Sequence, residues 1–556
     1  MTKLSSPRSE LRAHYQVVVI GSGYGGAIAA SRLSRAGREV CLLERGSEIR
    51  PGDYPSTEPE LLPQIQTHVM GKRVGSAAAM FSFHQDKDIN VVSGCGLGGT
   101  SLINAGICIR ADESTFKGDH WPEAIRNTSL EKYYQLAESM LQPSELPGHL
   151  ETLHKVAAFK QAAGSFAGQF KKVPILVNFK ELPETKNHLG VEQNACVHCG
   201  DCITGCNYGA KNTVLMNYLP DARQHGAHIF TEITVESIQK ESRHWRINIV
   251  DTQGEVLNLT HLTAEIVIVA AGTLGSNEIL LRSRVHGLPL SDKLGSRFSG
   301  NGDMISLAYN SDHVVDGVGF GKHPATGRIP VGPTSSNVID CRNTDSVFLI
   351  EAAIPGAFAK LLPASLAVLA KTTGQTAARG FRKRLQDYWR ETTSALFGAY
   401  RGAVQNTLFV LAVAQDDSSG VIRLENDAIK IDWSGVGRQP GIQQADRAMH
   451  RVSDALGATY IPNPVWNELT QRNLLTGHPL GGCTMADSAE FGVVNHKGQV
   501  FSKTQGSEVH TGLYVMDGSI VAGALGVNPL LTISGLVERC CDHLAQDYQW
   551  TIDYRM

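Results

Sequence analysis

The chain has 556 residues, more than one hydrophobic core usually organises, so two domains are expected. Charged residues make up 19% and apolar residues 42%, and there are 56 glycines, which excludes disordered and fibrous proteins and indicates a turn-rich α/β enzyme. A net charge of −3 gives no electrostatic basis for nucleic-acid binding, and no run of about 18 apolar residues predicts a membrane span. Residues 1–14 lack the apolar core of a secretory signal, which predicts a cytoplasmic protein.

A nucleotide-binding pattern lies near the start of the chain. An unbroken β-branched run, Val17 to Ile20, predicts a strand buried on both faces. It is followed by Gly21, Gly23 and Gly26 in the spacing G-x-G-x-x-G, which permits a tight turn, the approach of a pyrophosphate and close packing of the next helix. Glu44 closes the next strand, where a carboxylate can accept both ribose hydroxyls. This order predicts an adenine dinucleotide site.

Two stretches of different character follow. The polar, proline-broken segment up to about Asp88 is expected to be a long loop. The segment from Val91 to Ile109 contains five glycines, which allow the backbone to pass close to a flat group, and Asn104 is the polar side chain expected to face that group.

Four of the eleven cysteines lie within eleven residues, as Cys196-x2-Cys199-x2-Cys202-x3-Cys206. This is the spacing of half a bacterial ferredoxin, in which close repeats let thiolates converge on an iron–sulfur cluster, although Asn207 stands where such runs have proline. Three hypotheses remain open: an iron–sulfur cluster that relays electrons to an external carrier, a structural zinc site, or a metal-free loop of reduced or disulfide-linked cysteines.

The middle of the chain predicts a second domain. A buried strand that begins at Glu265 ends at Gly272 before a helix, like a second phosphate-side turn. Apolar strands such as Ser346 to Ile354 are then expected to form the floor of a substrate cavity. They are interrupted by a helical insertion, 356–403, whose apolar part and basic part (Arg379 to Arg384) suit either an active-site lid or a membrane-contacting surface. Both alternatives favour a bulky apolar substrate.

Taken together, these motifs resemble the glucose–methanol–choline (GMC) flavoprotein oxidoreductases, and within them the bacterial cholesterol-oxidase-like branch. Further motifs in the family's order are Gly209-Ala-Lys-Asn-Thr213, Gly477-His-Pro-Leu-Gly-Gly-Cys483, Tyr514-Val-Met-Asp-Gly518 and Gly526-Val-Asn-Pro529. The resemblance implies a Rossmann-like FAD-binding domain and the oxidation of an alcohol carbon, with hydride transfer to flavin N5.

The resemblance also assigns residues to the cofactor. Those implied at the ADP half are Gly21, Gly23, Gly26, Glu44 and Val235. Those implied along the isoalloxazine, the ribityl chain and the pyrophosphate are Gly98, Gly99, Asn104, Asp517, Gly518 and Asn528, with Gly272 as the second phosphate-side turn.

His478 and Asn528 resemble the pair that flanks the substrate hydroxyl in this family. A neutral imidazole suits proton acceptance from the hydroxyl, and an amide can orient the same oxygen. The alternative is a core histidine before the rigid Pro479. Glu351 is a second candidate base, because burial in its apolar strand would raise its pKa; a structural acid paired with an arginine is the competing hypothesis.

The predicted fold class is therefore α/β. The FAD-binding domain is expected from residues 1–120, 196–300 and 466–556, a cap segment from 121–195, and the substrate-binding domain from 301–465. The predicted activity is FAD-dependent oxidation of a sterol-like or long-chain alcohol, with oxygen or a redox carrier protein as the electron acceptor and peripheral membrane contact as an option. The alternatives are an isomerase, lyase or decarboxylase on the same fold, or a flavin electron-transfer protein.

Overall fold

The computed structural model describes residues 3–69, 71–181, 185–322, 329–376, 380–467 and 470–555. Its largest sheet has eight strands contributed by separate parts of the chain. The strand order is β20 (Gln499–Phe501), β21 (Val509–Val515), β11 (His261–Val269), β1 (His14–Ile20), β2 (Val40–Leu43) and β8 (His228–Phe230). An antiparallel pair, β9 (Ile233–Lys240) and β10 (Trp245–Asp251), extends from β11.

The centre of this sheet is parallel, since β1 pairs in parallel with β2 and β11, and β11 with β21. Parallel strands are covered on both faces, which explains why their sequences are continuous apolar runs. The covering helices are α1 (Tyr24–Arg35), α6 (Tyr218–Gln224), α7 (Gly272–Val285) and α12 (Leu530–Asp547), with α4 (Glu131–Leu141) packed on α12. The predicted α/β fold, with its main sheet built from discontinuous segments, is confirmed.

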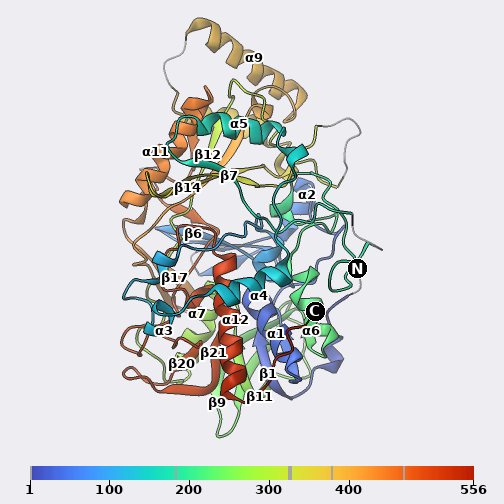
Figure 1. Cartoon of the computed structure of the whole chain (residues 1–556), viewed down its shortest axis with the longest axis vertical. Helices are drawn as coiled ribbons and strands as arrows, with labels where there is room; N and C mark the ends of the chain where they lie inside the picture. The colour runs from blue at the N-terminus through green and yellow to red at the C-terminus, as the bar shows by residue number, and fades with distance from the viewer. Residues whose placement is uncertain are drawn as a thin grey trace.

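A second sheet of six strands lies above the first (Figure 1). Its order is β18 (Thr459–Pro462), β12 (Met304–Tyr309), β15 (Leu408–Val413), β14 (Val347–Ala352), β13 (Asn337–Cys341) and β7 (Gln169–Lys172). All of its pairs are antiparallel. Helices α5 (His154–Ala163) and α11 (Pro440–Ala455) pack against it.

A third sheet lies between the other two in Figure 1, where β6 marks its position. Its order is β19 (Leu474–Thr476), β6 (Ile89–Gly94), β5 (Phe81–Gln85), β3 (Ile65–Val69) and β4 (Lys72–Val74). The prediction of a long loop up to about residue 88 is therefore wrong, because β3, β4 and β5 lie within it. Strands β3 and β4 are short and partly exposed and lack the apolar alternation by which a strand is recognised.

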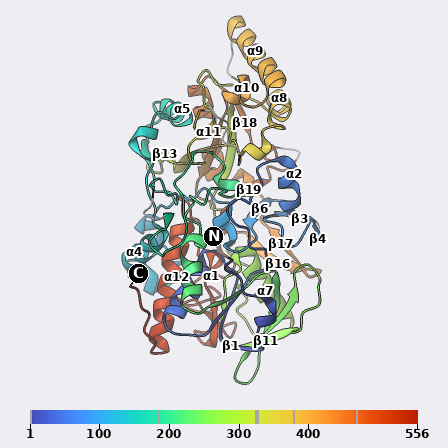
Figure 2. The ribbon, with the colours of Figure 1, turned by 90° about the vertical axis from the view of Figure 1, so that its right-hand side faces the viewer.

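The smaller elements complete the fold. They are α2 (Glu58–Leu61), α3 (Glu123–Arg126) and the hairpin of β16 (Val421–Glu425) and β17 (Ala428–Asp432). The insertion forms α8 (Leu362–Thr372), α9 (Phe381–Phe397) and α10 (Gly402–Gln405), and α9 projects at one end of the molecule (Figures 1 and 2). Within the described residues, no helix has the length and apolarity to cross a membrane.

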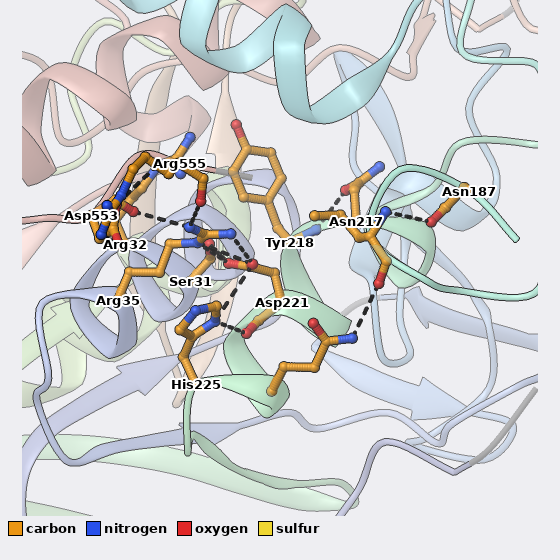
Figure 3. Close-up of polar contacts among 12 residues, drawn as sticks. Ser31, Arg32, Arg35, Asn187, Asn217, Tyr218, Asp221, His225, Asp553 and Arg555 are labelled. Carbon is orange, nitrogen blue, oxygen red and sulfur yellow. Dashed lines mark hydrogen bonds and ion pairs between the residues drawn. The ribbon is translucent and has the colours of Figure 1, made fainter.

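A buried polar network fastens α1 to α6 and to the C-terminal tail (Figure 3). The carboxylate of Asp221 has no exposed surface and accepts hydrogen bonds from Arg35 Nη2 at 2.6 Å and Ser31 Oγ at 2.5 Å. Arg35 Nη1 also donates to the main-chain carbonyl of Asp553 at 3.0 Å. Because a buried carboxylate needs compensating partners, this pairing fixes α6 beside α1.

Candidate functional site

A cavity of about 1910 Å³ receives lining residues from all three sheets. Ligand pockets of about 300–1,000 Å³ are typical of drug-sized molecules. This cavity is therefore large enough for a dinucleotide and a second molecule.

The carboxyl ends of β1 and β2 form one end of the cavity, where Gly21, Gly23 and Glu44 line it. A Cβ atom added to Gly23 would meet nothing within 4 Å, so the backbone here faces open space. Gly26 does not line the cavity, and a Cβ atom there would lie 1.9 Å from the carbonyl oxygen of Gly21. Gly23 thus leaves room for a ligand, whereas Gly26 permits close packing of α1 on the turn.

Glu44 is held rigidly at this end of the cavity. Its Oε2 accepts hydrogen bonds from Ser22 N at 3.1 Å and Ser22 Oγ at 2.6 Å, and its Oε1 accepts one from Gly46 N at 2.8 Å. Each carboxylate oxygen has further lone pairs, so Glu44 can still accept hydroxyl donors from a ligand.

Most of the other residues implied at the cofactor line the same cavity: Gly99, Asn104, Val235, Gly272, Asp517, Gly518 and Asn528. Gly98 does not line it. Its φ is 109°, a left-handed conformation that favours glycine, and its N–H donates to Ser22 Oγ at 2.9 Å. Gly98 therefore shapes the turn beside the ligand space.

Asp517 acts as a connector rather than as a free carboxylate. Its Oδ2 accepts hydrogen bonds from Gly272 N at 2.9 Å and Ser276 Oγ at 2.5 Å, and its Oδ1 accepts one from Ser519 N at 2.8 Å. Burial raises the pKa of this carboxyl. Asp517 therefore positions the first turn of α7, which borders the cavity.

Two amide oxygens in the cavity wall are buried and have no partner among the described residues: Asn104 Oδ1 and Asn528 Oδ1. Their amide nitrogens are used, since Asn104 Nδ2 donates to Tyr24 OH at 2.9 Å and Asn528 Nδ2 lies 3.2 Å from His478 Nε2. A buried unsatisfied acceptor costs about 1–3 kcal/mol, so both oxygens are suited to donors of a bound molecule. This arrangement fits a flavin and a hydroxyl substrate.

His478 and Asn528 meet at this wall, together with an acid that the sequence analysis missed. His478 Nδ1 lies 2.8 Å from Asp303 Oδ1. The second oxygen, Asp303 Oδ2, accepts from Thr476 Oγ1 at 2.9 Å and Gly477 N at 3.0 Å. Because a carboxylate only accepts, we assign the imidazole proton to Nδ1, which leaves the lone pair of Nε2 beside Asn528. In this arrangement the lone pair of Nε2 accepts the hydrogen bond from Asn528 Nδ2, and a bound hydroxyl that takes the place of this donor can pass its proton to Nε2.

Glu351 lies elsewhere. It is fully buried on β14, and its neighbours Ile350 and Ala352 line the cavity whereas Glu351 does not. Successive strand residues face opposite sides, so Glu351 points toward α5, where its Oε2 lies 2.5 Å from Lys155 Nζ. Its Oε1 accepts from Ser336 N at 2.8 Å. The structure does not support Glu351 as the base; its contacts are those of a structural acid, paired with a lysine rather than an arginine.

The substitution Glu351→Gln is expected to lower stability by about 3–5 kcal/mol, because it leaves the Lys155 ammonium buried and unpaired. Chemical unfolding of the holoenzyme measures this change. The pH profile of kcat is expected to keep its shape. Loss of the limb that reports the catalytic base, without loss of stability, would contradict the structural role.

The four predicted cysteines lie together, because Cys196, Cys199, Cys202 and Cys206 all line one small cavity of about 10 Å³. All four are free thiols. Burial raises the pKa values of Cys196, Cys199 and Cys202, which keeps these thiols protonated. No group of three or more His, Cys, Asp or Glu side chains in the described ranges is placed to hold a metal ion.

A buried lysine joins this cysteine loop to the wall of the large cavity. Lys211 Nζ donates to the main-chain carbonyls of Cys202 at 3.0 Å, Asn104 at 2.6 Å and Leu102 at 3.1 Å. Burial lowers the pKa of Lys211 to about 8. The cysteine loop and the loop that bears Asn104 are therefore directly connected.

The insertion does not cover this site. None of its described residues, 356–376 and 380–403, lines the large cavity. The lid hypothesis thus receives no support from the structure. The first residue of the predicted basic stretch, 379, lies outside the described residues.

Comparison with known proteins gives consistent matches. Two family models described as GMC oxidoreductase match residues 16–299 and 416–536. A cholesterol oxidase of Mycobacterium tuberculosis is 26% identical, over 95% of this chain and 91% of the relative. A long-chain-alcohol oxidase of Arabidopsis thaliana is 22% identical, over 95% of this chain and 68% of the relative. The solved structure of a fungal aryl-alcohol oxidase covers 97% of this chain and is itself fully covered, with a TM-score of 0.61 at 14% identity.

Proposed function

The chain belongs to the GMC oxidoreductase family, whose members bind FAD, and on this premise we propose that it oxidises the hydroxyl of a hydrophobic, sterol-like or long-chain alcohol to a carbonyl. The observation that carries the proposal is the meeting of His478 and Asn528 at the wall of a large cavity. The relatives named as cholesterol oxidase and long-chain-alcohol oxidase support this substrate class.

The substrate-domain side of the cavity is apolar. Its lining side chains come from β12, β14 and β15 and include Met304, Ile305, Ile350, Phe409, Leu411 and Val413. Such a surface binds hydrocarbon by removing it from water and offers a sugar few hydrogen-bond partners. This lining supports an apolar alcohol.

The residues of this chain then have distinct tasks. Gly23 and Glu44 would hold the ADP half of FAD, and Asn104 the ring system; FAD, when bound, supplies the hydride acceptor. His478 Nε2 takes the hydroxyl proton as the carbon–hydrogen bond breaks, and Asn528 orients the same oxygen. Asp303 accepts the hydrogen bond from Nδ1 and stabilises the imidazolium that forms.

The function is tested by turnover of a graded set of alcohols: sterols, long-chain alcohols, benzylic alcohols and sugars. Carbonyl product is measured with an artificial acceptor and, separately, with oxygen through peroxide release. Bulky apolar alcohols are expected to give the highest kcat/KM. If the protein were instead an isomerase, a lyase, a decarboxylase or an electron-transfer protein, no alcohol would yield a carbonyl.

A second candidate concerns the electron acceptor. The four cysteines enclose too small a space for a cluster as they stand and must lose their protons to bind one. We propose that, after such a rearrangement, they would hold an iron–sulfur cluster, which would supply a route for electrons to a redox carrier protein. The ferredoxin-like spacing and the common cavity support this proposal, and Lys211 connects the two sites. Direct reoxidation by oxygen is the competing route.

Anaerobically purified protein is expected to contain iron and acid-labile sulfide. The variant Cys202→Ser is expected to lose both and to lose reoxidation by a carrier, while its flavin is still reduced by alcohol. Cys341→Ser, at a buried free thiol outside this cavity, is the matched control. Protein that is free of iron and reoxidised directly by oxygen would exclude the cluster and leave the alcohol chemistry intact.

Sterols and long-chain alcohols partition into lipid. The proposed function therefore includes peripheral contact with a membrane.

A further inference from the structure

Helix α9 has an inverted amphipathic arrangement. Its polar face packs on the protein: Lys383 pairs with Asp312, Arg390 Nη1 donates to the carbonyl of Ser311 at 2.8 Å, and Ser394 is buried. A surface helix normally buries its apolar face, whereas α9 buries its polar face and leaves the opposite face exposed.

That opposite face is apolar and exposed. The exposed fractions range from 48% to 80% for Phe381, Leu385, Tyr388, Trp389, Leu396 and Phe397. At 3.6 residues per turn, all of these except Phe397 fall in a stripe about 100° wide. Half of the large apolar side chains exposed by the described part of the chain lie between residues 358 and 397. We call the five aligned residues the α9 stripe.

Two arginines border the α9 stripe. On the same helical geometry, Arg382 lies along one edge and Arg384 along the other. Both residues are exposed, and neither forms an ion pair with a described residue. An apolar stripe that contains Tyr and Trp and is flanked by cations is the pattern of a helix lying in the interface of an anionic membrane.

We propose that α9 docks the protein on an anionic lipid surface, with the helix axis in the plane of the membrane and the α9 stripe in the headgroup region. This inference rests on the proposed function only for the purpose of the membrane contact, which would give the enzyme access to an alcohol dissolved in lipid. Charge complementarity supports the lipid, because the free arginines match anionic headgroups.

The dimensions of α9 favour lipid over a second copy of the chain. The helix has 17 residues, so its exposed face is about 26 Å long and about 10 Å wide, or roughly 260 Å². A stable dimer buries about 800 Å² on each partner. Figures 1 and 2 show α9 as a projection at the end of the molecule, where it can meet a flat surface.

The test is co-sedimentation of the holoenzyme with vesicles of phosphatidylcholine alone or mixed with phosphatidylglycerol. Binding is expected to be stronger on the mixed vesicles and to weaken with salt. The double variant Arg382→Gln/Arg384→Gln is expected to lower the partition coefficient by about tenfold or more. The double variant Leu385→Ser/Trp389→Ser is expected to abolish binding, whereas Trp389→Phe, which stays apolar, is expected to retain it.

Matched controls are Phe491→Ser and Lys503→Gln, at exposed positions far from α9 in the sequence, and both are expected to bind like the wild type. Equal binding by the α9 variants, or no binding to mixed vesicles, would overturn the proposal. A wild-type dimer in solution that Leu385→Ser/Trp389→Ser converts to a monomer would also overturn it and make the stripe a self-interface. Circular dichroism and flavin content verify folding, and turnover of a water-dispersed alcohol tests the proposed function separately.

Discussion

Replacement of His478 by alanine is expected to lower kcat by about 10²- to 10⁴-fold, the contribution typical of a positioned general base. The lone pair of Nε2 lies beside Asn528 and is the group in this wall suited to take the hydroxyl proton. Its loss leaves the hydride to depart from a neutral alcohol, which is a harder step. Stopped-flow measurement of flavin reduction isolates this step from reoxidation.

His478→Gln serves as the conservative comparison, because glutamine keeps a polar group near Asn528 but cannot take up a proton. It is expected to lose nearly as much rate as the alanine variant. His510→Ala, at a buried histidine whose ring bonds to the carbonyl of Pro289 outside the cavity, is the matched control and is expected to keep its rate. If His478 were only a core residue, both His478 variants would lower stability and leave flavin reduction unchanged.

Replacement of Asp303 by asparagine is expected to lower kcat by about 10²- to 10⁴-fold with little change in KM, although Asp303 is a positioning residue. The native carboxylate accepts three hydrogen bonds, from His478 Nδ1, Thr476 Oγ1 and Gly477 N. The side chain of asparagine has only one oxygen, and that oxygen is needed to accept the hydrogen bond from Gly477 N. The amide nitrogen then faces Nδ1, which must become the acceptor, so the proton moves to Nε2 and the site loses its base.

The proton NMR signal of His478 Nδ1–H separates this change of tautomer from a general loss of structure. The signal is expected in the wild type and absent in Asp303→Asn. Thr476→Val removes one donor to the carboxylate and the acceptor of the His478 main-chain N–H but keeps the tautomer, so it is expected to lose no more than about tenfold in kcat. A variant Asp303→Asn that turns over at the wild-type rate would exclude this role of the carboxylate.

The nucleotide-binding part was predictable because its signals are local. The β-branched run, the glycine turn and Glu44 follow one another within about thirty residues, and each has a single structural explanation. The implied cofactor residues that are far apart in sequence line one cavity, apart from Gly26 and Gly98, which shape the backbone around it.

The acid beside His478 was not predictable, because Asp303 and His478 are 175 residues apart and no local pattern marks the pair. The face to which Glu351 points was not predictable for a different reason. All six residues of β14 are buried, so its sequence has no alternation that distinguishes the cavity face from the face toward Lys155. In α9, periodicity reveals an apolar face but not whether that face packs inward.

The most direct test of the account is anaerobic mixing of the FAD-loaded holoenzyme with a sterol or a long-chain alcohol, followed by flavin absorbance and product analysis. The account predicts that the flavin absorbance bleaches, that about one carbonyl forms per flavin, and that His478→Ala slows the bleaching by about 10²-fold or more. A flavin that dithionite reduces but that no alcohol of the graded set reduces would contradict it.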